Sequence, residues 1–140
     1  MKPDHITIEE LARRAAVRFL WDDCKTHPRF EALIEQARRS DMKVAAYKGA
    51  PPQAVLEIIH TIHGLDTLEP LANKVAGIIR DQGNASSVEG LRPEAMRDIS
   101  ATIALTCDDS GLGGMGLTTK GVFDTLAAER SQLMMEGIKP

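Results

Sequence analysis

The chain has 140 residues, with 17 lysines and arginines against 20 aspartates and glutamates, and two cysteines. This length suits one domain, and a hydrophobic content of 43% is enough to build a core, which excludes a disordered chain. No apolar run reaches the roughly 18 residues of a membrane span, and the first residues lack the apolar core of a signal peptide. We therefore expect one cytoplasmic domain, residues 1–140, with reduced thiols and no membrane association.

The composition also indicates the fold class. Aromatic residues make up only 4% of the chain, and alanine, leucine and isoleucine carry most of its apolar content. Strand-rich domains usually need more aromatic and β-branched residues to cover a pleated surface. The sequence therefore predicts an all-α bundle of about six helices, arranged as successive helical hairpins.

The first predicted helix begins after Thr7, because Thr7 and Glu10 form a capping box. It should end near Cys24, since Pro28 cannot continue a helix and restrains the residue before it. Steps of three and four residues predict one apolar face, made of Ile8, Leu11, Ala12, Ala15 and Phe19.

A second helix is predicted to begin with Pro28 in its first turn and to bury Phe30, Leu33, Ile34 and Ala37. The short link to the first helix predicts an antiparallel hairpin, with Phe19, Trp21 and Phe30 as packing partners. Residues 40–50 show no clear periodicity.

The third and fourth helices follow Pro52 and end at Gly64 and Gly83, because glycine is a common helix terminator. The core face of the third is Val55, Ile58, Ile59 and Ile62. The fourth has the clearest periodicity, with an apolar side of Leu68, Leu71, Ala72, Val75, Ile78 and Ile79.

A fifth helix begins at Pro93 and includes residues 99–106, which carry no charge. This run could be a strand from its β-branched content, but a lone strand among helices has no partner, so we expect a central buried helix. A sixth helix begins at Thr118 or Thr119 and ends at Gly137. Its predicted inward face is Val122, Phe123, Leu126, Ala127, Leu133 and Met134.

The glycine-rich segment Gly111–Gly116 matches the G-x-G-x-x-G pattern that lets backbone amides approach a pyrophosphate. Too few residues follow it for the second strand of a dinucleotide-binding unit, and Leu117 stands where a phosphate loop has lysine. We interpret the segment as a connection between helices, with an anion site at the start of the last helix as the alternative.

Histidines and a cysteine form the candidate metal site. His60 and His63 lie about one helical turn apart, and Cys24 and His27 could add a thiolate and a third imidazole. Zinc favours such ligands in tetrahedral geometry, so zinc is the cofactor of this alternative. The competing interpretation is surface or boundary histidines and a protein without a cofactor.

Two acidic pairs flank the cysteines: Asp22 and Asp23 precede Cys24, and Asp108 and Asp109 follow Cys107. Both pairs are predicted near helix C-termini, where the helix dipole disfavours negative charge. Converging carboxylates could hold a divalent cation or meet a basic partner. The alternative is that nearby cations and solvent neutralise them, so their role stays open.

The charge of the chain is uneven, slightly basic before residue 50 and acidic after it. Five arginines could line one surface of the first hairpin and contact a partner: Arg13, Arg14, Arg18, Arg38 and Arg39. The alternative function is a DNA-binding regulator, which would use either these arginines or the third and fourth helices, a helix-turn-helix in outline. A mildly acidic domain is repelled by phosphate unless its charge is segregated.

The favoured prediction is a regulatory or adaptor protein that binds another protein or a second copy of itself. Met134 and Met135 support it, because adjacent methionines cannot both face one core and one is offered to a partner. No serine lies in a nucleophile elbow, so the sequence gives no support for an enzyme. DNA binding and zinc binding are the alternatives.

Overall fold

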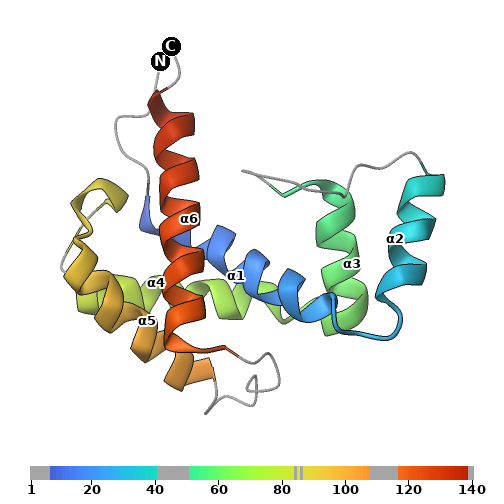
Figure 1. Cartoon of the computed structure of the whole chain (residues 1–140), viewed down its shortest axis with the longest axis horizontal. Coiled ribbons are helices and arrows are strands. Elements are labelled where there is room, and N and C mark those ends of the chain that lie inside the picture. The colour runs from blue at the N-terminus through green and yellow to red at the C-terminus, as the bar shows by residue number, and fades with distance from the viewer. Residues whose placement is uncertain (1–6, 41–50, 84, 86, 108–116, 139–140) are drawn as a thin grey trace.

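Six α-helices and one short 3-10 helix form the computed structural model, which describes residues 7–40, 51–83, 85, 87–107 and 117–138 (Figure 1). Their bounds are α1 (Ile8–Cys24), α2 (Phe30–Arg39), α3 (Gln53–His63), α4 (Leu68–Gly83), η1 (Val88–Gly90), α5 (Pro93–Cys107) and α6 (Thr119–Ile138). No strand occurs in these ranges, which confirms the predicted all-α class. None of the described helices combines the length and the apolar character that crossing a bilayer requires.

Helix α1 lies at the centre of the fold, where it packs most extensively against α4 and also against α6 and α3 (Figure 1). The Thr7 hydroxyl accepts a hydrogen bond from the Glu10 amide at 3.1 Å, so the predicted cap is confirmed. From Leu11 to Trp21 nearly every side chain is buried. Side chains on most sides of α1 are thus covered by neighbouring helices, in agreement with its central position.

Helices α4, α5 and α6 complete the body of the molecule, which we define as α1, α4, α5 and α6. Arg130 of α6 donates to the carbonyl oxygens of Val88 and Leu91, at 3.2 and 3.4 Å, and so ties the segment before α5 to α6. The predicted helix over residues 99–106 is confirmed, but only one of its faces is buried, so its predicted central buried position is wrong. Leu105 is 67% exposed, because α5 turns only one face towards its neighbours α4 and α6.

Helices α2 and α3 form an arm at one side of the body (Figure 1). The predicted hairpin of the first two helices is wrong in its pairing, since α2 makes its most extensive contact with α3, and α1 with α4. The edge-to-face contact of Trp21 and Phe30, with ring centroids 5.2 Å apart, is confirmed at the joint between α1 and α2. Pro28 lies before α2, which begins at Phe30.

Helix ends follow the glycine and threonine positions with one exception. Gly64 ends α3 with a φ of 97°, a left-handed conformation that glycine adopts without strain. The Thr118 hydroxyl accepts from the Gly121 amide at 3.0 Å at the start of α6. Gly137 does not end α6, which continues to Ile138. Residues 41–50, which show no clear periodicity, and the predicted connection at 111–116 lie outside the described residues.

Candidate functional site

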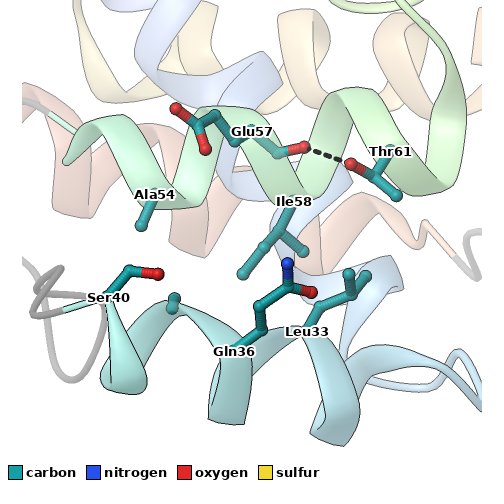
Figure 2. A pocket seen from close by; sticks show the side chains of 8 residues that line it. Leu33, Gln36, Ser40, Ala54, Glu57, Ile58 and Thr61 are labelled. Carbon is teal, nitrogen blue, oxygen red and sulfur yellow. Dashed lines mark hydrogen bonds between the residues drawn. The ribbon is translucent and has the colours of Figure 1, made fainter.

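The arm carries an open groove between α2 and α3 with a volume of about 140 Å³ (Figure 2). Its lining residues recur three and four positions apart on each helix, so one face of α2 meets one face of α3. Four of them are apolar, namely Leu33, Ala37, Ala54 and Ile58. The other four are polar, namely Gln36, Ser40, Glu57 and Thr61.

The polar lining of this α2–α3 groove is ordered by local hydrogen bonds. The Thr61 hydroxyl donates to the Glu57 carbonyl oxygen at 2.8 Å, as Figure 2 shows. The Gln53 side-chain amide donates to Glu57 Oε2 at 3.3 Å. Glu57 is therefore held on the exposed side of α3, and its carboxylate is the only formal charge among the residues that line the groove.

The groove is open because its helices carry small residues where they approach each other. Ala37 and Ala54 are both buried and both line it, and a larger side chain at either position would fill part of the space. Cavities of about 150 Å³ lined by aliphatic and aromatic residues hold a molecule of benzene. The groove therefore has room for one aliphatic or aromatic side chain.

A second pocket, of about 250 Å³, lies between α1 and α6 and is lined mainly by charged groups. Arg18 Nη2 lies 3.3 Å from Glu129 Oε2, and Glu129 is only 5% exposed. Burial raises the pKa of Glu129, while the charge of Arg18 opposes the rise. A hydrogen bond and ion pair with Asp124, at 2.8 Å, raises the pKa of Lys120 beside it. These charged groups are paired within the chain, so the pocket is a polar contact region between α1 and α6.

Arg14 is a correction to the predicted partner surface, because it is only 7% exposed. Its guanidinium donates two hydrogen bonds to the Glu136 carboxylate, at 2.8 and 2.6 Å, and these bonds raise the pKa of Arg14. Its Nε lies 3.8 Å from Glu10 Oε2. Arg14 therefore joins α1 to α6 inside the body and is not available to a partner.

The other four arginines of that prediction are divided between the body and the arm. Arg13 pairs with Glu69 of α4, and Arg18 pairs with Glu129 as described. Arg38 and Arg39 are exposed on α2, where Arg39 Nε lies 3.6 Å from Glu35 Oε2. The five side chains thus do not form one surface, because α1 turns its arginines towards α4 and α6.

The predicted metal ligands lie at the ends of α1 and α3. His63 Nε2 is 3.1 Å from Asp23 Oδ2, and His27 Nδ1 accepts from the Arg29 amide at 3.1 Å. Burial, and then the charge of Asp23, raises the pKa of Cys24 to about 12, so its thiol is protonated at neutral pH. Among the residues that the structure describes, no group of three or more histidine, cysteine, aspartate and glutamate side chains is arranged to hold a metal ion. His60, His63, Cys24 and His27 therefore form no such group.

The acidic pairs are only half described. Asp22 lies 3.4 Å from Lys25 Nζ, and Asp23 Oδ2 lies 3.1 Å from His63 Nε2, so each carboxylate of the first pair has a basic side chain beside it. Asp108 and Asp109 lie outside the described residues, and the convergence of the two pairs stays a prediction. Cys107 before them is buried; burial raises its pKa, and the charge of Lys74 opposes the rise.

The adjacent methionines of α6 face different ways. Met134 is partly buried against the core, and Met135 is 65% exposed. Two other large hydrophobic side chains, Leu65 and Leu105, are also exposed, at 74% and 67%. The three belong to different elements: Leu65 lies in the turn between α3 and α4, Leu105 in α5 and Met135 in α6. A role of Met134 and Met135 in partner binding stays a prediction.

Sequence reasoning missed the groove, although the signal was present in the pattern of α2 and α3. Ala37 and Ala54 were visible as small residues on apolar faces, but the pairing of these two helices was not predicted. Comparison with protein families, with curated proteins and with solved structures gave no significant match.

Proposed function

We propose that the protein is a regulatory or adaptor protein that binds a partner protein through the α2–α3 groove. The observation that carries this proposal is the groove itself, with an apolar part of Leu33, Ala37, Ala54 and Ile58 beside polar side chains. Protein interfaces have the same anatomy, in which an apolar centre is surrounded by a polar rim. Helices on both sides present the site, so its shape exists before a partner binds.

The position of the groove on the arm supports a binding role. In α2 only Ile34 and Ala37 are buried, so most of this helix is accessible to another molecule. The arm is joined to the body through the Trp21–Phe30 contact, the His63–Asp23 pair and the packing of α3 on α1. A partner can therefore contact α2 and α3 without disturbing the core of the body.

The state of the two cysteines argues against thiol catalysis. Cys24 and Cys107 are buried, and burial raises the pKa of both. A nucleophilic cysteine needs an accessible thiolate, which these environments disfavour. The cysteines therefore have the character of core residues, and binding is the function that the geometry supports best.

Site-specific photo-crosslinking tests the proposal. A benzophenone amino acid in place of Gln36 lies on the groove, and the same amino acid in place of Asn73 on the exposed face of α4 is the matched control. We expect one protein to be crosslinked from position 36 and not from position 73. The purified partner should then bind the wild-type chain, and Gln36→Arg should weaken binding about tenfold or more while Asn73→Arg does not.

Other outcomes of the same experiment would contradict the proposal. Equal crosslinking from both positions, or a purified partner that binds Gln36→Arg as tightly as wild type, would exclude the groove as the interface. A crosslink between two copies, with a dimer in light scattering, would replace the partner protein by a homodimer. Binding of duplex DNA at low salt, without any crosslinked protein, would support the DNA-binding alternative.

A further inference from the structure

We infer that protonation of His63 tightens the joint between the arm and the body, so that the freedom of α3 to move away from α1 depends on pH. This property of the fold is independent of what the α2–α3 groove binds. Two features carry it, namely the place of the His63–Asp23 contact in the chain and the geometry of that contact.

The His63–Asp23 contact lies where the chain enters and leaves the arm. The chain enters through the residues between α1 and α2 and leaves through those between α3 and α4. His63 is the last residue of α3, and its Nε2 lies 3.1 Å from Oδ2 of Asp23, close to the end of α1. The Thr67 hydroxyl donates to the His63 carbonyl oxygen at 2.7 Å and fixes this residue at the exit. The contact therefore connects the exit of the arm to its entry.

This contact depends on charge rather than on a directed hydrogen bond. Although His63 Nε2 is shielded from solvent, it forms no hydrogen bond of acceptable geometry with any residue that the structure describes. A neutral imidazole presents either a lone pair or a poorly aimed N–H to the Asp23 carboxylate. A protonated imidazole presents a positive charge, and solvent screens it only in part, because the two side chains are 15% and 23% exposed. Protonation of His63 therefore strengthens the contact.

Other titratable side chains lie on the elements that meet at the joint. On α1, the link to α2 and the first turn of α2 they are Asp22, Cys24, Lys25, His27, Arg29 and Glu31. On α3 and the start of α4 they are Glu57, His60, Asp66 and Glu69. Two of these carboxylates have cations of their own, since Asp22 lies 3.4 Å from Lys25 Nζ and Glu69 pairs with Arg13. Asp23 is the carboxylate that contacts His63 directly.

His27 acts at the entry to the arm and in the opposite sense. Its Nδ1 accepts a hydrogen bond from the Arg29 amide at 3.1 Å, which a protonated imidazole cannot do. Protonation of His27 thus weakens the start of α2, whereas protonation of His63 tightens the end of α3. The amides of α3 are therefore the ones that report on His63.

Hydrogen exchange of the whole protein at about pH 5.5 and pH 8 tests the inference, because histidine ordinarily changes its charge within this range. Each measured rate is compared with the intrinsic rate at the same pH, which gives a protection factor for each amide of α3. We expect these protection factors to be about two- to fivefold higher at pH 5.5, as a partly exposed ion pair allows.

Four variants assign the response to the joint. His63→Gln and Asp23→Asn each remove the charge of one partner, and His60→Gln, one turn earlier on α3, is the matched control. We expect the first two variants to lose the pH response of α3, and His60→Gln and His27→Gln to keep it. Each variant retains the other titratable groups of the body, so a difference between variants isolates the joint.

The same measurements can overturn the inference. Protection factors of α3 that do not change with pH in the wild-type protein would show that His63 does not tighten the joint. A pH response that persists in His63→Gln or in Asp23→Asn would place the titrating group elsewhere, and so would a response that disappears in His60→Gln.

Discussion

The body and the arm differ in how much of each helix is buried. In the body, α1 is buried along almost its whole length between α4, α6 and α3, whereas α2 in the arm buries only Ile34 and Ala37. Burial of apolar surface is the main source of stability, so most of the folding free energy comes from the body. Within the arm, α3 buries four apolar side chains, whereas α2 contributes little stability and its exposed face remains accessible.

The two regions also use charge differently. Between helices of the body, arginines pair with glutamates: Arg14 with Glu136, Arg18 with Glu129, Arg13 with Glu69, and Arg80 with Glu9. In the arm, Arg39 pairs with Glu35 of the same helix, and Glu57 has only an intrahelical bond. The charges of the body therefore join helices to each other, whereas the ion pair and hydrogen bond that lie wholly within the arm stay within single helices.

Leu11→Ala tests the contribution of the body and should have the largest effect. Leu11 is fully buried on α1, and such truncations lower the free energy of unfolding by about 2–5 kcal/mol. Leu65→Ala, at an exposed position, is the control and should change it by less than about 0.5 kcal/mol. Urea denaturation followed by circular dichroism measures both values. Similar losses of unfolding free energy in the two variants would contradict the larger contribution of buried α1 side chains.

Arg14→Leu should have the next largest effect, because it removes the guanidinium that donates two hydrogen bonds to the partly buried Glu136 carboxylate. We expect the free energy of unfolding to fall by about 1–3 kcal/mol. Arg14→Leu combined with Glu136→Leu should recover part of that loss, since no unpaired charge remains. A double variant no more stable than the single one would show that the ion pair does not join α6 to α1.

Ile34→Ala should act on the arm alone. Removing one of the two buried side chains of α2 should speed hydrogen exchange of α2 amides by about tenfold or more. Exchange of α1 and α4 amides should stay at the wild-type rate, because they open only with the body. Equal acceleration in both regions would mean that arm and body unfold as one unit.

Glu129→Gln should have the smallest effect, and it should depend on pH. Burial raises the pKa of Glu129, so the folded state keeps this proton to a higher pH than the unfolded state. The ionisation of Glu129 therefore lowers the free energy of unfolding as the pH rises above about 4.3, the pKa of glutamate in an unfolded chain. The variant should gain stability relative to wild type between pH 4 and pH 7 in urea titrations, with Glu94→Gln as the control. If the stability of the variant relative to wild type stayed constant or fell as the pH rises, the prediction would be contradicted.

The sequence predicted the features that depend on neighbouring residues. The cap at Thr7, the end of α3 at Gly64 and the helical state of residues 99–106 all follow from local rules and match the structure. The apolar pattern of α1 showed that it is buried but not that α4 is its main partner. Periodicity defines the face of a helix and not the helix that it meets.

The candidate site depended on that missing information. The groove requires α2 to pair with α3, so it was not predicted. Arg14 was placed on a surface because its charge was considered without the partner that buries it, Glu136, which lies far along the chain. A buried cation becomes recognisable only when the acidic group that pairs with it is known.

The central position of α1 also has a consequence for how the protein is made. Helix α1 is synthesised before α4 and long before α6, the helices that cover it. At a ribosomal rate of about 5–20 residues per second, its apolar side chains wait roughly 5–20 seconds for α6. The nascent chain therefore exposes the helix with the largest number of buried residues during synthesis, which makes α1 the segment where chaperones are expected to bind first.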